Sequence, residues 1–358
     1  MFLDLVESPT LSKARYDRLL SQGYFRSGGM LFRTDLICVE GEVWTPVNIR
    51  LDLKDFATSK SQRKLLRRVR KRFQVRIHPF VWDEEREALY QAFKGHFKGF
   101  IHADLESFLL EGNPQLATDT REVAVYDGSR LVGFSLFDCA SSSLASLLAV
   151  YHADYARWSL GRFSLIEEAL WAQENGLRWV YPGYVLDQPS LFDYKLLLGP
   201  MRHRNARGRW LDMAAFNSQD TIAHEVREAS NRLAHALKLR MLPDERHMYP
   251  YFSLAFVHEP SSFLDLPIYF ELGGEPGRPW VAGFHPVELR FVLAEVEDLA
   301  YPIEDELLKE RWRELAMGPT MYMYGARMLR FSDADALADH AWKALRSWDT
   351  PSTSSPYY

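Results

Sequence analysis

The sequence predicts an α+β fold, in which strands and helices group in separate runs of the chain. Two observations carry this prediction. Residues 122–151 alternate between apolar and polar side chains as strands do, and Asp127-Gly128 within this run is a hairpin turn signal. Apolar residues between Phe163 and Leu170 then recur at helical spacing. We therefore expect three antiparallel strands followed by a helix.

A small N-terminal module is expected at residues 1–80, with a helix at 16–22 and an extended segment at 45–53. It ends in a basic stretch, because residues 60–76 contain nine Lys or Arg and no acid. Apolar residues from Leu65 to Phe73 fall at helical spacing, so the stretch should be a helix with a cationic outer face. Such a face would bind the phosphates of RNA, although a solvated surface and a membrane-surface helix remain alternatives.

The second predicted domain, residues 81–215, begins with a helix at 82–96 and continues with the three strands. The next helix should end at Asn175-Gly176, a good C-terminal cap, before a strand at 177–180. Pro182 cannot donate a ladder hydrogen bond, so this strand should part from its neighbour and open a gap in the sheet. The order of elements is that of a GNAT-type acyltransferase fold, and the gap would admit a substrate backbone.

A further α+β domain of unknown role is expected at residues 216–350, followed by a disordered tail at 351–358. It should contain a helix at 221–240, strands near 251–257, 267–271 and 288–294, and a charged helix at 303–316. The histidines His247, His258 and His285 would form a metal site only if the fold joined them, and we expect no metal.

Composition sets the broad class of the protein. A chain of 358 residues with 47% hydrophobic content can bury the cores of two or three domains. We found no stretch that reads as a signal peptide or a membrane span, so the expected location is the cytoplasm, with no membrane partner. Two cysteines are too few for a disulfide framework or a four-cysteine cluster.

Motifs in both halves of the chain resemble those of the aminoacyl-tRNA–protein transferases, the arginyl and leucyl transferases of the N-degron pathway. The resemblance covers roughly residues 15–210. The motifs that carry it are Gly23 to Gly28, Pro46-Val47, Phe56 to Lys64, Leu89-Tyr90 with His96, Ser159-Leu160-Gly161, Glu168, Tyr181-Pro182-Gly183-Tyr184 and Tyr194-Lys195.

The resemblance implies an enzyme that moves arginine or leucine from a charged tRNA to the N-terminal α-amine of a protein or peptide. The tRNA is then a co-substrate, and no cofactor is expected. The implied catalytic residues are Glu168, Tyr184, Tyr194 and Lys195. The implied substrate-binding residues are Arg26, Ser27, Tyr181 and Gly183. The implied tRNA-binding residues are Ser61, Gln62, Arg63, Lys64, Arg67 and Arg68.

Each of these residues also has a purely structural interpretation. Tyr181 could instead be a core tyrosine, Lys195 an exposed lysine and Glu168 the buried partner of a cation. Two rival functions also stay open. A coenzyme A-dependent N-acetyltransferase shares the fold, but three residues separate Arg157 from Gly161, and this spacing does not match its pyrophosphate loop. A non-catalytic RNA-binding relative would keep the cleft without turnover.

The chain departs from the family pattern in its cysteines. Of the N-terminal cysteine series, only Cys38 is present, and Gly41 and Trp44 stand at other expected places. An N-terminal metal or iron–sulfur site is therefore not expected. Phe192 replaces the usual methionine before Tyr194, and the C-terminal domain is an addition, so we expect a divergent member.

Overall fold

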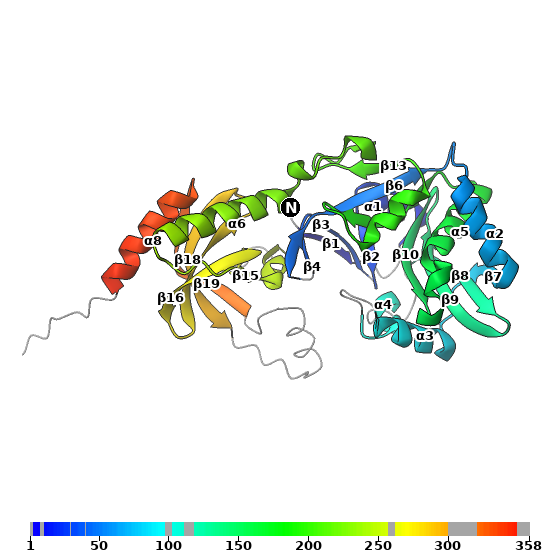
Figure 1. The fold of residues 1–358 in the computed structure, drawn as a ribbon, viewed down its shortest axis with the longest axis horizontal. Coiled ribbons are helices and arrows are strands. Elements are labelled where there is room, and N and C mark those ends of the chain that lie inside the picture. Colours follow the sequence, from blue (N-terminus) through cyan, green and yellow to red (C-terminus); the bar gives the residue numbers. More distant parts are fainter. Residues whose placement is uncertain are drawn as a thin grey trace, which may run out of the picture. The chain divides into compact units, whose positions relative to one another are not determined.

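The computed structural model describes residues 3–7, 11–28, 30–39, 41–96, 102–110, 118–256, 262–299 and 321–348. The chain divides into two compact units (Figure 1). The mixed-sheet unit contains residues 5–33 and 46–217, and the antiparallel-sheet unit contains residues 1–4, 34–45 and 218–358. The expected module of residues 1–80 is thus not a separate unit, because most of it folds with residues 81–217.

The described part of the mixed-sheet unit is built of helices and strands that alternate along the chain. In chain order the elements are β1 (Leu3–Glu7), α1 (Lys13–Ser21), β2 (Phe25–Ser27), β3 (Met30–Thr34), β6 (Pro46–Asp52), α2 (Lys60–Arg72), β7 (Gln74–Pro79), α3 (Glu84–Lys94), α4 (Leu105–Leu110), β8 (Asp119–Asp127), β9 (Arg130–Cys139), β10 (Ser143–Tyr151), η1 (Ala153–Trp158), α5 (Leu160–Glu174), β11 (Trp179–Tyr181), β12 (Tyr184–Leu186), η2 (Leu191–Leu198), β13 (Met201–Arg204), β14 (Trp210–Asp212), η3 (Met213–Ala215) and η4 (Ser218–Asp220), the last of which already lies in the other unit.

The central sheet has the strand order β14-β13-β6-β11-β10-β9-β8-β7. The β10–β11 pair is parallel, and the other pairs along this path are antiparallel. Helices α2 and α5 share one apolar cluster with the sheet, whereas α1, α3 and α4 belong to two other clusters. The sheet is therefore covered on both faces, and three antiparallel strands, a helix and a parallel strand follow one another as in a GNAT-like domain.

The capping residues explain where α2 and α5 begin and end. The Ser59 hydroxyl accepts a hydrogen bond from the Gln62 backbone N–H, and the Gln62 side-chain oxygen accepts one from the Ser59 backbone N–H, a capping box that starts α2. Helix α5 ends at Asn175, and Gly176 follows with a positive φ of 73°. The basic helix is shorter than predicted: it stops at Arg72, and residues 74–79 form β7, where Val75 and Ile77 turn toward the core.

The antiparallel-sheet unit has the strand order β15-β16-β17-β18-β19. Its elements are the hairpin β4 (Ile37–Val39) and β5 (Glu42–Trp44), then α6 (Ile222–Leu239), β15 (His247–Met248), η5 (Pro250–Phe256), β16 (Ile268–Glu275), β17 (Arg278–His285), β18 (Arg290–Leu299), β19 (Met321–Phe331) and α8 (Ala334–Trp348). One apolar cluster contains Leu36 and Val43 of the hairpin region together with buried residues of α6, the sheet and α8.

Several sequence predictions for these elements are confirmed, namely the helices at 16–22, 82–96 and 221–240 and the strands between 122 and 151. The strand predicted near 251–257 is wrong, because residues 250–256 form a 3₁₀ helix. Tyr249, Phe252 and Ala255 are buried at every third position, which suits this helix rather than a strand. The predictions for residues 303–316 and 351–358 lie outside the described residues.

Candidate functional site

The predicted gap in the sheet is present between β10 and the β11–β12 segment. Strand β11 pairs with β10 only from Trp179 to Tyr181, and β12 then pairs with β6 instead. On the other side of the gap, the β9–β10 ladder shifts register between Ser146 and Leu148. The β9–β10 ladder is therefore irregular just beyond the point where β11 stops pairing with β10.

Gly183 makes this divergence geometrically possible. Its φ is +90°, a backbone conformation that side-chain-bearing residues rarely adopt. A Cβ at this position would also lie 3.3 Å from the Lys195 Nζ. The structure thus joins Gly183 and Lys195, two of the residues expected at the site, although they are twelve positions apart in the chain.

Lys195 folds back over the gap from η2. Its ammonium donates a hydrogen bond to the Tyr184 carbonyl oxygen at 3.0 Å and lies 4.8 Å from the Phe192 ring centroid. Across the described part of the chain, no carboxylate forms an ion pair with it, and burial lowers its pKa to about 8. Lys195 is therefore a cation with spare donors beside the gap, not a surface lysine.

Glu168 lies on the face of α5 that packs against the sheet, and its side chain is completely buried. Neither carboxyl oxygen has a hydrogen-bond partner of good geometry. Burial is the main cause that raises its pKa to about 7, and the nearby hydroxyls of Ser135 and Ser146 offset part of the effect. A buried carboxyl that titrates near neutrality is typical of acid–base sites, and no cation among the described residues forms an ion pair with it.

Tyr194 lies close enough to Glu168 for the carboxylate charge to act on its phenol. It lies next to Lys195 on η2, and burial together with the Glu168 charge raises the pKa of its phenol to about 12. This hydroxyl thus stays protonated at neutral pH and remains a hydrogen-bond donor. Tyr184 packs edge-on against Phe25 and Phe192, at centroid distances of 5.2 and 5.4 Å, and forms the aromatic wall beside Lys195.

Ser135 and Ser146 were not predicted as site residues. Strand alternation could have found them, because residues two positions apart share a face. Phe137 and Leu144 lie two positions from Ser135 and Ser146, and both belong to the cluster that contains α5. Both hydroxyls belong to that same sheet face, on the two strands nearest Glu168. They are polar side chains in an otherwise apolar layer.

Tyr181 does not belong to this group. It is buried with Tyr16 and Leu20 in the cluster formed by α1, on the sheet face opposite α5. Its hydroxyl accepts a hydrogen bond from Arg50 at 3.4 Å. The structural interpretation of Tyr181 therefore describes its environment better than the expected substrate contact.

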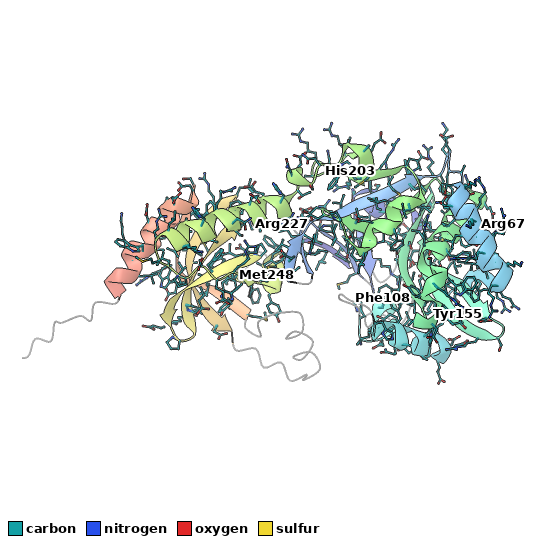
Figure 2. All side chains as sticks on the ribbon, in the orientation of Figure 1. Arg67, Phe108, Tyr155, His203, Arg227 and Met248 are labelled. Atoms are coloured by element: carbon teal, nitrogen blue, oxygen red, sulfur yellow. The ribbon has the colours of Figure 1, made fainter. Side chains whose placement is uncertain are left out.

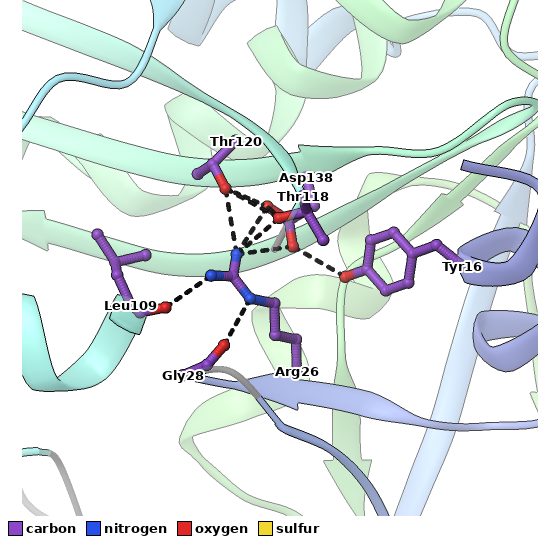
Figure 3. A network of polar contacts seen from close by, with 7 residues as sticks. All are labelled: Tyr16, Arg26, Gly28, Leu109, Thr118, Thr120 and Asp138. Atoms are coloured by element: carbon purple, nitrogen blue, oxygen red, sulfur yellow. Dashed lines mark hydrogen bonds and ion pairs between the residues drawn. The ribbon is translucent and has the colours of Figure 1, made fainter. Parts of the chain in front are cut away.

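Arg26 is likewise engaged within the protein (Figure 3). Its guanidinium donates to both oxygens of Asp138 at 3.0 Å, to Thr118 and Thr120, and to the carbonyls of Gly28 and Leu109. Asp138 also accepts from the Tyr16 hydroxyl. These contacts engage all three guanidinium nitrogens of Arg26, so this buried arginine fixes β2 to β9 instead of meeting a substrate. Ser27 follows it in β2, and its side chain lies outside the described residues.

The basic helix α2 presents free cations to solvent. Arg67, labelled in Figure 2, and Lys64 are exposed and make no hydrogen bond or ion pair in the described structure. The same holds for Lys60 and Lys71, which were not among the predicted site residues. Arg70 and Arg72 instead pair with Glu167 and Asp127.

Three other predicted tRNA-binding residues have partners in the protein. Ser61 is exposed and bonds to the Ser59 hydroxyl at 3.0 Å, and Arg63 donates to the Thr58 carbonyl. Arg68 donates to the carbonyls of Arg157 and Trp158, just before α5 begins. Their exposed surfaces still belong to the cationic face of α2.

Gln62 is buried, at 1% exposure, and does not reach solvent. Its amide donates to the carbonyls of Leu197 and Leu198, at 3.0 and 2.9 Å, while its oxygen caps the start of α2. This position corrects the predicted RNA contact. Gln62 instead ties the first turn of α2 to the end of η2, the helix that carries Tyr194 and Lys195.

A groove of about 420 Å³ lies elsewhere in this unit, between α2, α5 and β7. Its walls include Phe73 and Trp171, and the Arg70–Glu167 ion pair stands at its edge. None of the predicted site residues lines it. The groove is therefore separate from the gap beside Gly183.

The described residues contain no group of three or more His, Cys, Asp or Glu side chains that could hold a metal ion. His285 bonds to Asp265 at 2.9 Å, and His258 lies outside the described residues. Burial raises the pKa of the Cys38 thiol to about 12, so this thiol stays protonated. Within the described ranges, no helix is both long enough and apolar enough to cross a membrane.

Comparison with known proteins places these observations in a family. The family model described as the N terminus of arginine-tRNA-protein transferase matches residues 3–64, and the one described as its C terminus matches residues 68–204. Together they span both the basic helix and the gap with Lys195.

Individual relatives carry a related name. An aspartate/glutamate leucyltransferase of Leptospira interrogans is 25% identical over 218 residues, which are 58% of this chain and 82% of the relative. One from Stenotrophomonas maltophilia is 28% identical and covers 58% of this chain and 85% of its own length.

Solved structures match more weakly. L-PGS from Bacillus licheniformis has a TM-score of 0.31 at 14% identity and covers 39% of this chain and 45% of its own. A GCN5-related N-acetyltransferase from Kribbella flavida has a TM-score of 0.24 at 12% identity and covers 38% and 47%. The GNAT-like fold is shown by the order and direction of the strands in the central sheet. On the two family models and the curated relatives, the chain belongs to the aminoacyl-tRNA–protein transferase family, as a divergent member.

Proposed function

We propose that this protein transfers an amino acid from an aminoacyl-tRNA to the N-terminal α-amine of a protein or peptide. The observation that carries the proposal is the buried, unpartnered Glu168 carboxyl beside a gap in the sheet that Lys195 overhangs. Family membership supplies the reaction class. The only co-substrate we propose is the charged tRNA, and no cofactor is invoked.

Glu168 acts as the general base in this proposal. The acceptor α-amine has an ordinary pKa near 7.7 to 8.0, so part of it is still protonated at neutral pH. A carboxylate whose pKa is about 7 can take a proton from the amine as it attacks the ester carbonyl. A normal surface glutamate would be a much weaker base for this step.

Tyr194 and Lys195 provide the positive electrostatic environment. As the amine nitrogen bonds to the ester carbon, negative charge develops on the carbonyl oxygen, and fixed donors there lower the barrier. The Tyr194 hydroxyl stays protonated and the Lys195 ammonium has donors to spare. The ester C–O bond then breaks, and the proton held by Glu168 passes to the departing ribose oxygen of the tRNA.

The cationic face of α2 holds the tRNA. Four of its cations are exposed and have no partner among the described residues, namely Lys60, Lys64, Arg67 and Lys71. Such cations suit phosphate contacts that release counterions. Gln62 connects this helix to η2, so RNA bound on α2 would lie on an element joined directly to the Lys195 segment.

Leucine is the first donor to test and arginine the second. The curated relatives are named as aspartate/glutamate leucyltransferases, and the family models are named for arginine. For the acceptor, we propose a peptide whose first residue is Asp or Glu. This finer assignment depends on the relatives' names and not on a pocket of this chain.

The experiment incubates purified protein with tRNA charged with labelled leucine or arginine and with peptides beginning Asp, Glu, Arg or Lys. We expect label to move to the peptides, with Glu168→Gln at least tenfold slower and Glu167→Gln far less affected. A parallel reaction contains labelled acetyl-coenzyme A. Transfer from acetyl-coenzyme A alone, or none from any donor, would exclude the proposed function.

A further inference from the structure

Two arginines lie directly opposite each other on neighbouring strands of the mixed-sheet unit. In the β6–β13 ladder, Arg50 on β6 pairs with Arg202 on β13. Their neighbours Ile49 and Leu51 belong to the apolar cluster under α2 and α5, so the arginines are on the other face. Like charges directly opposite each other destabilise an antiparallel pair. A bound anion would remove the repulsion between these two guanidinium groups.

The surroundings of Arg50 strengthen this argument. Its guanidinium carbon lies 3.8 Å from the ring centroid of Trp179 and 4.3 Å from that of Trp210. Its one hydrogen bond in the described structure is to the Tyr181 hydroxyl, at 3.4 Å, and its Nε is buried without a partner. The two indoles thus hold a half-buried guanidinium that no carboxylate neutralises.

The nearby carboxylates do not cancel this charge. Asp52, two residues along β6, forms a two-pronged ion pair with Arg178 at 2.5 and 2.7 Å. Asp212 lies 3.9 Å from Arg202, and its side chain is 82% exposed, which makes a weak contact. The arginine pair therefore keeps an excess of positive charge.

The β13–β14 hairpin extends the same surface. His203, labelled in Figure 2, packs with Phe216, and strand alternation places Arg202 and Arg204 on the other face from it. Arg207 and Arg209 in the turn are exposed. The Asn205 side chain accepts the backbone N–H groups of both at 3.1 and 2.9 Å, which holds the turn in one conformation.

We propose that this arginine surface, defined as Arg50, Arg202, Arg204, Arg207 and Arg209, binds backbone phosphates of RNA. The inference rests on the proposed function, since the RNA it binds would be the tRNA substrate. Several cations spread over a strand pair and its turn suit a polyanion better than a single carboxylate.

The test measures binding of uncharged tRNA by fluorescence anisotropy between 50 and 300 mM salt, in wild type and two double variants. The test variant is Arg207→Glu/Arg209→Glu, in an exposed turn where misfolding is not expected. The control is Arg278→Glu/Arg327→Glu, which makes the same charge change on the antiparallel-sheet unit. We expect the test variant to bind about tenfold more weakly, with a salt slope lower by about 0.7–0.9 per phosphate lost. The control should bind within twofold of wild type.

A second variant, Arg50→Met, tests the anchor. It keeps an apolar stem between the indoles, so we expect a normal thermal transition with tRNA binding at least threefold weaker. Unchanged tRNA binding in both test variants, with wild type binding well, would overturn the inference and leave the proposed function standing. If only the KM for acidic-start peptides rises, the surface binds the acceptor and the RNA assignment is wrong. If wild type binds no tRNA, the proposed function itself fails.

Discussion

At the scale of single residues, Glu168 is a site residue whose burial lowers the stability of the folded state. Its carboxyl is buried on an apolar helix face with no cation beside it, an arrangement that folding alone would disfavour. Its pKa is raised from 4.5 to about 7, so the folded state binds its proton more tightly than the unfolded chain does. The free energy of unfolding should therefore fall as pH rises from about 4.5 to 7. Above pH 7 the stabilisation that comes from the bound proton is lost.

Glu168→Gln should make the protein more stable at pH 8 while slowing transfer. The neutral amide has a similar shape but no charge to bury, so the free energy of unfolding at pH 8 should rise by up to about 3 kcal/mol. At pH 4.5 the change should be small. Urea denaturation at both pH values measures it. Glu167→Gln is the matched control, since it breaks the ion pair with Arg70 and should lower the free energy of unfolding at pH 8. A lower free energy of unfolding for Glu168→Gln at pH 8 would contradict the burial argument.

Lys195 should set the alkaline side of the pH dependence. Its pKa is lowered from 10.5 to about 8, so the ammonium is lost as pH rises through 8, while Glu168 becomes a carboxylate as pH rises through 7. Transfer should peak between these values. Lys195→Ala should lower the rate at least tenfold and remove the alkaline fall, measured after subtraction of uncatalysed ester hydrolysis. Lys54→Ala, an exposed lysine of the same unit, should behave as wild type; an unchanged alkaline fall in Lys195→Ala would assign it to another group.

At the scale of elements, the side chain of Gln62 joins the start of α2 to the end of η2. Gln62 caps the first turn of α2 with its oxygen and binds the last two carbonyls of η2 with its nitrogen. A buried amide with all these partners is costly to remove, because each partner is then left unsatisfied. The position of Lys195 should therefore depend on a residue that touches no substrate.

Gln62→Ala should reduce turnover more than RNA binding. Loss of its bonds should lower the free energy of unfolding by about 1–3 kcal/mol. The rate at saturating substrates should fall, while the Kd for tRNA stays within twofold of wild type. Gln62→Glu keeps the oxygen that caps α2 but loses the amide N–H donors to η2, so its rate should fall as in Gln62→Ala. Ser61→Ala, at the neighbouring position, should keep the wild-type rate. Weaker tRNA binding with an unchanged rate would show that Gln62 contacts RNA and does not position Lys195.

Much of this element arrangement could be predicted from the sequence. The period of the apolar residues located α5 and the three strands, and Pro182 located the parting of β11 from β10. Only Pro182 and Gly183 separate Tyr181 from Tyr184, yet the chain turns at Gly183. Tyr181 packs in the α1 cluster, whereas Tyr184 packs against Phe192. Motif spacing could not show this. It also could not show that Arg26 would pair with Asp138, which lies 112 positions further along the chain.

At the scale of the whole molecule, the two units are interleaved in sequence. Residues 34–45 leave the mixed-sheet unit and fold with residues 218–358. Leu36 and Val43 from this segment are almost completely buried in that unit's core. Arg227 of α6 also donates to the Val43 carbonyl at 2.6 Å. The antiparallel-sheet unit is therefore not a simple C-terminal addition.

Deletion of residues 218–358 should leave a protein that binds tRNA but aggregates. The family matches end at residue 204, so the basic helix and the gap remain, whereas Leu36 and Val43 lose their core. Light scattering and binding of a hydrophobic dye should both rise. The same truncation carrying Leu36→Ser and Val43→Ser should stay dispersed. Equal aggregation of both truncated forms would show that the hairpin is not the cause.

The interleaving also sets an order of events during synthesis. The hairpin at residues 34–45 leaves the ribosome early, but its partner helix α6 starts only at residue 222. At ordinary translation rates of 5–20 residues per second, the intervening chain takes on the order of ten to thirty seconds to make. During that time Leu36 and Val43 are without their native cover, and a nascent chain of this protein would be a client for chaperones that bind short apolar segments.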